Sequence, residues 1–197
     1  EDVTLLDGGR VRLPAGLKPG ANLRPRGEDV ARGTVVLEAG RRLDPRGIAL
    51  LAALGVERIA VRRRPRVAVF STGDEIREPG TTLGPAALYD SNRFSLMAML
   101  RRAGCDVTDL GILPDDLAAT ADHLGRAAAA HDLIVTSGGV STGEEDHVKA
   151  AVEARGALHF WRLAIKPGRP VAMGTIGGAA FVGLPGNPVA VFVTWAH

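Results

Sequence analysis

One stretch, residues 132–146, limits most strongly what this chain can fold into. It begins with an apolar run, residues 133–135, that is typical of a parallel strand buried on both faces. Residues 136–143 are mainly glycine, serine and threonine, too small and flexible for a helix or a strand, and acidic residues 144–146 then open a segment of helical spacing. A strand, a glycine-rich turn and a helix N-terminus form a recurrent geometry for binding phosphate.

The glycines of this turn suit an anion. Gly138 and Gly139 have no Cβ, so backbone N–H groups can approach a ligand closely there. The turn matches neither the Walker A motif nor the dinucleotide fingerprint, and a turn without a ligand explains the glycines equally well when they are taken alone. The acidic cluster that follows would repel a bare phosphate but could hold a metal that accompanies one.

Length and composition exclude several classes of protein. The 197 residues are 46% hydrophobic, which is enough to bury a core in one or two domains. Basic residues are mostly scattered and only 4% of the chain is aromatic, so we expect no nucleic-acid partner. A single cysteine, Cys105, excludes an internal disulfide and a cysteine-based zinc site. No apolar run approaches the roughly 20 residues of a membrane span, so we expect a cytoplasmic protein without a membrane partner.

The chain divides into two parts of different pattern. Residues 1–62 are predicted to be the end of a small β-rich domain with a connecting helix that starts at Asp44 and Pro45. Segments broken by glycine and proline predict its strands over residues 11–14, 22–25, 34–37 and 57–61. The first residue is not methionine and residues 193–197 end within an apolar pattern, which indicates an excerpt of a longer chain.

Residues 63–197 alternate strand and helix patterns, which predicts a three-layer α/β domain with a mostly parallel sheet. Strands are expected over residues 67–70, 106–113, 133–135 and 158–165, followed by a hairpin of residues 171–173 and 180–183. Functional sites in such sheets lie outside the carboxyl ends of the strands.

Charged residues gather at those predicted ends. Glu75, Asp115 and Asp146 follow the first three strands, and Lys166 and Arg169 follow the fourth. Acids that could hold a divalent metal, together with bases that could hold oxyanions, are typical of phosphoryl or nucleotidyl chemistry.

The motifs at these positions resemble the MoeA family, the molybdenum insertases that include the E domain of gephyrin. The matching segments are residues 65–75 (PRVAVFSTGDE), 89–92 (YDSN), 137–143 (SGGVSTG), 166–170 (KPGRP) and 184–188 (LPGNP), with residues 27–29 (GED) upstream. The resemblance implies a MogA-like molybdopterin-binding domain over residues 63–197, truncated at its C-terminal side, preceded by part of a MoeA-type β-rich domain.

The resemblance also implies a reaction: transfer of molybdate into adenylylated molybdopterin, with release of AMP and a requirement for Mg²⁺, by a homodimer. The implied catalytic residues are Glu75, Asp115, Asp146, Lys166 and Arg162, and the three acids are the implied metal ligands. The implied binding residues are Thr72, Gly73, Asp74, Ser137, Gly138, Gly139, Ser141, Gly143, Arg169, Pro185, Gly186 and Asn187.

Arg162 stands where the family usually has lysine, so a planar fork replaces a point charge. Arg162 and Lys166 are four residues apart, so on one extended strand they would share a face, and we expect them to hold the molybdate between them.

Two other functions stay open. A molybdopterin adenylyltransferase of the MogA type shares the Gly-Gly-Val-Ser turn, but the unit of residues 1–61 and the Leu-Pro-Gly-Asn-Pro motif speak against it. A scaffold without catalysis, like the receptor-clustering role of gephyrin, would not need the intact set of acids.

Overall fold

The computed structural model describes residues 3–139, 147–162, 164, 166–167 and 170–196, with the backbone alone for residues 160–162 and 170. The chain forms two compact units, Glu1–Val61 and Arg62–His197.

The first unit contains one short β-pair and one helix. Strand β1 (Thr4–Leu5) pairs antiparallel with β2 (Val11–Arg12), and the 3₁₀ helix η1 (Asp7–Gly9) lies between them. Helix α1 (Pro45–Ala53) begins as predicted, because the Asp44 carboxylate accepts the backbone N–H of Gly47 at 2.8 Å.

The strands predicted over residues 22–25, 34–37 and 57–61 are wrong, since this described part of the chain is irregular there. Asn22 has a φ of 61°, outside the range of strands, and turn bonds such as Leu23 N–H to the Gly20 carbonyl close the backbone locally. None of the described apolar side chains of this unit is buried. Isolated short strands without a hydrophobic face to pack are not stable, which explains the error.

The second unit is built on a six-stranded sheet of order β6-β3-β7-β10-β9-β8. The strands are β3 (Arg66–Thr72), β6 (Asp106–Leu113), β7 (Leu133–Ser137), β8 (Gly156–Arg162), β9 (Pro170–Ile176) and β10 (Ala179–Leu184). The first four strands in this order, β6, β3, β7 and β10, run parallel to one another, whereas β9 runs antiparallel to both β10 and β8. The predicted mostly parallel sheet and the β9–β10 hairpin are confirmed.

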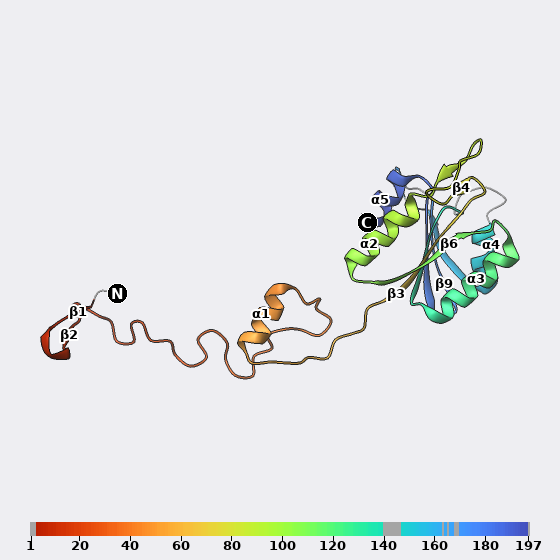
Figure 1. The fold of residues 1–197 in the computed structure, drawn as a ribbon. Helices are drawn as coiled ribbons and strands as arrows, with labels where there is room; N and C mark the ends of the chain where they lie inside the picture. The colour runs from red at the N-terminus through yellow and green to blue at the C-terminus, as the bar shows by residue number, and fades with distance from the viewer. Residues whose placement is uncertain (1–2, 140–146, 163, 165, 168–169, 197) are drawn as a thin grey trace. The chain divides into compact units, whose positions relative to one another are not determined.

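Helices cover both faces of this sheet, which confirms the three layers (Figure 1). On one face, α3 (Leu117–Ala130) and α4 (His147–Arg155) contribute Leu124 and Val152 to a core that includes Phe70. On the other face, α2 (Asn92–Ala103) packs Leu96 against Val69, and α5 (Pro188–Ala196) adds to the same core. Each such side chain, when fully buried, contributes about 1.5–3 kcal/mol.

Side chains at the helix starts fix where α2, α3 and α5 begin. Asp116 accepts the Ala119 N–H at the start of α3, and Asn187 accepts the N–H groups of the first turn of α5. At α2 the capping side chain is not that of Ser91, which makes no such bond, but that of Asp90, which accepts the Arg93 N–H at 3.1 Å.

Two boundaries differ from the prediction. Thr136 and Ser137 belong to β7 and not to the turn, because they pair in register with Phe70 and Ser71 of β3 and are buried. Strand β8 ends at Arg162 instead of extending to residue 165. Between β3 and α2 lie two minimal parallel strands, β4 (Ile76–Arg77) and β5 (Leu88–Tyr89).

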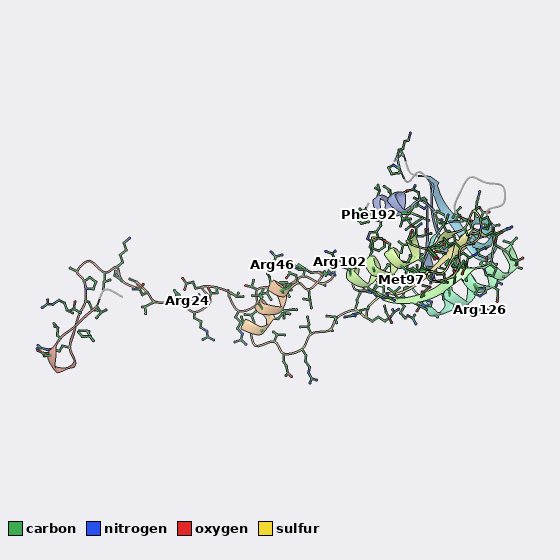
Figure 2. The ribbon with its side chains drawn as sticks, turned by 45° about the horizontal axis from the view of Figure 1, so that its top comes forward. Arg24, Arg46, Met97, Arg102, Arg126 and Phe192 are labelled. Atoms are coloured by element: carbon green, nitrogen blue, oxygen red, sulfur yellow. The ribbon has the colours of Figure 1, made fainter. Side chains whose placement is uncertain are left out.

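Several exposed arginines form ion pairs close by in the sequence. Arg24 pairs with Asp29, Arg46 with Asp44, and Arg126 with Asp122, each within five residues. Figure 2 labels these three arginines. Among the residues that the structure describes, no helix is both long and apolar enough to cross a membrane.

Candidate functional site

The carboxyl ends of the central strands meet at one edge of the sheet. Ser137, which ends β7, pairs with Ser71 of β3 on one side and with Leu184 of β10 on the other. Thr72 of β3 pairs with Leu113 of β6. The predicted turns after β3, β6, β7 and β10 therefore leave the sheet side by side, at the edge where ligands of α/β proteins bind.

The turn after β3 carries a carboxylate folded back over a glycine. Glu75 is exposed, and a Cβ on Gly73 would lie 2.9 Å from its Oε2 atom. Gly73 has a φ of 139°, so a side chain there would be strained as well as crowded. The absence of a side chain at position 73 thus lets the Glu75 carboxylate lie close to the end of β3, next to Thr72 and Asp74.

Hydroxyl groups in this part of the sheet are buried without a partner. Among the described side chains, the buried oxygens of Ser71, Thr72 and Thr136 have no hydrogen bond. An unsatisfied buried hydroxyl destabilises the fold unless a ligand or a water molecule supplies the missing bond. These hydroxyls lie in the last residues of β3 and β7, so they mark the same edge as the predicted turns.

Close packing explains the glycines of the turn after β7. A Cβ on Gly138 would lie 2.8 Å from the Thr72 carbonyl oxygen, and one on Gly139 would lie 2.4 Å from Cγ2 of Val148. Both glycines have positive φ, 91° and 64°. The turn therefore needs glycine in order to pack against β3 and α4, whether or not a ligand binds there.

Asn92, which sequence reasoning did not include among the site residues, connects the end of β7 to the turn after β10. Its Nδ2 group donates to Ser137 Oγ at 2.8 Å and to the Gly186 carbonyl at 2.7 Å. Ser137 Oγ donates in turn to the Pro185 carbonyl at 3.4 Å. The available signal was the Tyr-Asp-Ser-Asn motif itself, in which an asparagine follows two residues suited to capping.

The acids after β6 have different surroundings. Asp116 caps α3, whereas the neighbouring Asp115 is exposed and makes no described hydrogen bond or ion pair. Glu75 and Asp115 follow neighbouring strands, so two carboxylates lie at the same edge. The described residues contain no group of three or more acids, histidines or cysteines arranged to hold a metal, and the third predicted ligand, Asp146, lies outside them.

The two predicted bases do not share a strand. Arg162 is the last residue of β8, and Lys166 is an exposed residue in a bend beyond it. The argument that period-two alternation places both on one face is therefore wrong. Because β8 runs in the same direction as β10, Lys166 still follows a strand at the edge of the candidate site. Ser141, Gly143 and Arg169 lie outside the described residues, as does the side chain of Arg162.

A buried arginine organises the loop that follows Glu75. Arg93 is 2% exposed and pairs with Asp90, Asp109 and Glu78, from the start of α2, from β6 and from the loop. Burial by itself would lower the pKa of the guanidinium, but the hydrogen bonds to the three carboxylates outweigh this effect and raise it. Arg93 therefore stays charged and ties the loop to the domain.

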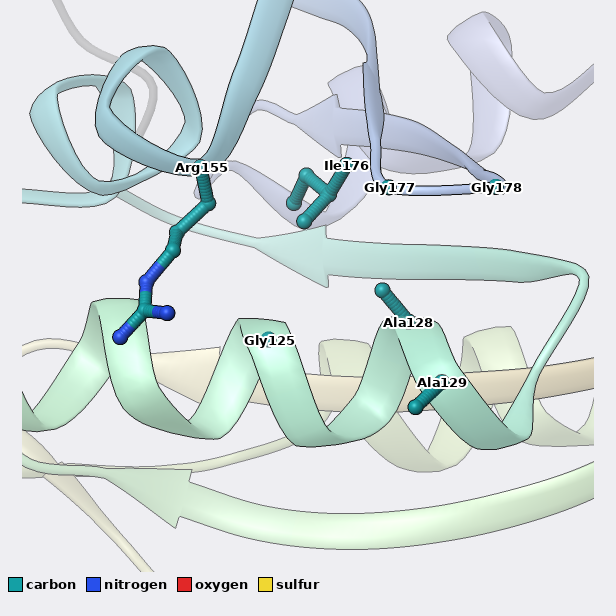
Figure 3. Close-up of a pocket in the computed structure, with 7 residues that line it drawn as sticks. All are labelled: Gly125, Ala128, Ala129, Arg155, Ile176, Gly177 and Gly178. Carbon is teal, nitrogen blue, oxygen red and sulfur yellow. The ribbon is translucent and has the colours of Figure 1, made fainter.

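A cavity of about 270 Å³ lies away from this edge (Figure 3). It is bounded by the β9–β10 turn at Gly177 and Gly178, by α3 at Gly125, Ala128 and Ala129, by Ile176, and by Arg155 at the end of α4. These residues precede β7, β8 and β10, so the cavity lies at the amino ends of the parallel strands and does not include a predicted site residue.

Comparison with known families defines the class of the second unit. Residues 68–197 match the family described as "Probable molybdopterin binding domain", and residues 1–55 match the "MoeA N-terminal region (domain I and II)". The chain belongs to the molybdopterin-binding domain family, and the two matches together identify it as a member of the MoeA family.

Individual relatives agree with this assignment. A molybdopterin molybdenumtransferase of Haemophilus influenzae is 46% identical over 99% of this chain and 48% of its own length. Molybdopterin molybdenumtransferase 2 of Mycobacterium tuberculosis is 42% identical over 98% of this chain and 50% of its own length. The crystal structure of the MoeA protein from Pyrococcus horikoshii superposes with a TM-score of 0.77 at 31% identity, covering 99% of this chain and 48% of that one. The chain thus spans about half the length of these relatives.

Proposed function

We propose that the protein to which this chain belongs is a molybdopterin molybdenumtransferase of molybdenum cofactor biosynthesis. The observation that carries the proposal is the convergence of the family's motifs at one sheet edge. The turns after β3, β7 and β10 follow neighbouring strands that pair in register, and Asn92 joins the end of β7 to the turn after β10. The names of the relatives, matched over nearly the whole chain, support the reaction class.

We propose that the substrates are adenylylated molybdopterin and molybdate, and that AMP is a product. The phosphate groups would lie over the turn at Gly138 and Gly139, where the end of β7 precedes α4 and neither glycine has a side chain that could block a ligand. Thr72, Gly73 and Asp74 on one side and Pro185, Gly186 and Asn187 on the other would contact the remainder of the nucleotide or the pterin. Ser137 would hold the turn in place. Lys166, with Arg162 and Arg169, would bind the molybdate oxyanion.

The exposed carboxylates at this edge suit Mg²⁺, which prefers oxygen ligands and keeps several of its water molecules. Glu75 and Asp115, with Asp146, would hold the ion, and it would supply charge neutralisation at the phosphoryl groups. The protein's own residues then orient the phosphoanhydride bond that links AMP to the pterin and hold the molybdate beside it.

The adenylyltransferase alternative is less well supported, because residues 1–55 match the MoeA N-terminal region and the relatives above are named as molybdenumtransferases. We also propose, on the basis of the family resemblance, that the protein is a homodimer and is cytoplasmic.

The deciding experiment uses the full-length protein with adenylylated molybdopterin, molybdate and Mg²⁺. We expect AMP release that depends on molybdate, together with molybdenum bound to the pterin. An adenylyltransferase would instead consume ATP and unmodified molybdopterin and release pyrophosphate. A protein that only binds molybdopterin, without either product, would refute the catalytic proposal and favour a scaffold.

A further inference from the structure

The side chain of Asn92 has an unusual place for the first residue of a helix. Its Nδ2 group bonds to Ser137 and Gly186, which lie 45 and 94 residues further along the chain. It does not cap its own helix, since Asp90 accepts the free N–H of that turn. The contacts of Asn92 therefore concern the two turns and not the stability of α2 alone.

The hydrogen-bond chemistry fixes the orientation of the Asn92 amide. A carbonyl oxygen can only accept, so the atom of Asn92 that faces the Gly186 carbonyl at 2.7 Å must be the nitrogen. Its second hydrogen goes to Ser137 Oγ, so both hydrogens of the Nδ2 group are used. The Ser137 hydroxyl passes its own hydrogen on to the Pro185 carbonyl. One amide group thus joins the end of β7 to the turn after β10.

We infer that Asn92 is a positioning residue that holds the turn at Gly138 and Gly139 at a fixed spacing from the turn at Pro185 and Gly186. This inference rests on the proposed function, because those two turns supply the proposed nucleotide and pterin contacts. Besides the ladder between β7 and β10, the other described hydrogen bonds between these segments run from Gly138 N–H to the Leu184 carbonyl at 3.1 Å and from Ser137 to Pro185. Displacement of a substrate-contacting group by about 1 Å can reduce a rate about a hundredfold.

The sharpest variant is Asn92→Asp. The new side chain has the same size, but a carboxylate has no hydrogen to donate, and one of its oxygens would face the Gly186 carbonyl oxygen. The matched structural control is Asn187→Asp, because the described hydrogen bonds of the Asn187 side chain are both accepted by Oδ1 and a carboxylate accepts equally well. The control for activity is Ser91→Ala, next to Asn92 at an exposed position without a capping bond.

In the full-length protein, Asn92→Asp should lower kcat for molybdate-dependent AMP release about tenfold or more, with KM for adenylylated molybdopterin changed less than about threefold. Ser91→Ala should match the wild type. Equal kcat for Asn92→Asp and wild type would overturn the inference.

Amide hydrogen exchange tests the inference independently of catalysis. If the wild type releases no AMP, that result refutes only the proposed function. Asn92→Asp should accelerate exchange at the amide of Gly138, which donates to the Leu184 carbonyl, while the β8–β9 pair and the Asn187→Asp protein keep wild-type protection. Unchanged exchange at Gly138 in a folded Asn92→Asp protein would show that Asn92 does not hold the turns.

Discussion

Arg93 and Asp90 form a salt bridge that is withdrawn from solvent, with 2.8 Å between Nε and Oδ2 and only 2% of each side chain exposed. The same aspartate caps α2, and the same arginine reaches Asp109 on β6 and Glu78 in the loop after β4. One buried cation therefore pairs with carboxylates from three segments, and its loss would leave Asp90 without its ion-pair partner in the interior.

We predict that Arg93→Met lowers the free energy of unfolding by about 3–5 kcal/mol, which is the effect of removing one partner from a buried ion pair. Urea unfolding monitored by circular dichroism measures this. Arg102→Met is the control, because Arg102 lies on the same helix but is exposed, and we expect a change of about 0.5 kcal/mol or less. A stability loss at Arg93 no larger than that at Arg102 would contradict the central role of this arginine.

From the hydrogen bonds of Asp132 we predict a specific dependence of the protein's stability on pH. Hydrogen bonds from the Arg63 guanidinium and from the Arg66 N–H hold the pKa of Asp132 well below its usual range. A carboxyl whose pKa is lower in the folded than in the unfolded state stabilises the protein above the unfolded value of about 4, and loses that contribution as the pH falls further.

Asp132→Asn should therefore be less stable than the wild type at pH 7, with the difference shrinking when both are measured at about pH 3, below the ordinary pKa of aspartate. Chemical unfolding midpoints at the two pH values test this. Asp122→Asn, in the exposed pair with Arg126 on α3, is the control and should have a smaller effect at pH 7. A stability difference between Asp132→Asn and wild type that increased on acidification would contradict the prediction.

Substitutions of the two neighbouring aspartates after β6 should affect different properties: stability for Asp116 and catalytic activity for Asp115. Asp116→Ala removes the cap of α3 and should cost about 1 kcal/mol while leaving molybdate-dependent AMP release nearly unchanged. Asp115→Asn should leave the unfolding midpoint unchanged and reduce that activity strongly, with partial recovery at higher Mg²⁺ concentration if Asp115 is a ligand. Loss of activity in both variants in proportion to their instability would remove Asp115 from the proposed site.

A single methyl group added at Gly138, in the turn after β7, should lower the stability of the domain. Gly138→Ala places a Cβ 2.8 Å from the Thr72 carbonyl in left-handed backbone, which we expect to destabilise the domain by about 1–3 kcal/mol. Gly186→Ala, where a Cβ meets no atom within 4 Å, should change stability by about 0.5 kcal/mol or less. Thermal unfolding of both variants distinguishes them. Equal stabilities would mean that the β7 turn has room to move.

We predict that Lys166 binds the molybdate oxyanion. Lys166→Ala should raise the molybdate concentration for half-maximal AMP release about tenfold, as expected for the loss of a charged hydrogen bond worth about 1.5 kcal/mol, and should leave the affinity for adenylylated molybdopterin nearly unchanged. Lys18→Ala, at an exposed position in the first unit, is the control. If instead pterin affinity falls and molybdate dependence stays the same, Lys166 contacts the phosphates.

Local patterns were sufficient to predict much of the second unit. The buried run before Ser137 is a parallel strand, and Asp44 caps its helix, because strand burial and capping depend on neighbouring residues. The same local propensity failed over residues 22–25, since a strand also needs a surface against which to pack.

Contacts between distant segments could not be predicted in this way. Asp109 approaches Arg93 only because β6 lies beside β3 under α2, and Asn92 finds Gly186 only because β10 lies beside β7. Period-two alternation was applied to Arg162 and Lys166 as if one strand held both, but the strand ends at the first of them. The roles of Glu75, Asp115, Asp146 and the other proposed site residues stay predictions.

The antiparallel strand β9 places a restriction on how this fold can change in evolution. The crossover through α4 sets the direction of β8, β9 turns back, and β10 turns forward again beside β7. One strand more or one fewer among β8, β9 and β10 would reverse the direction of the last strand. The Leu-Pro-Gly-Asn-Pro turn would then lie at the opposite edge of the sheet, beyond the reach of Asn92. Related chains that keep this turn should therefore gain or lose strands here in pairs, an even-step rule that an alignment of their structures can check.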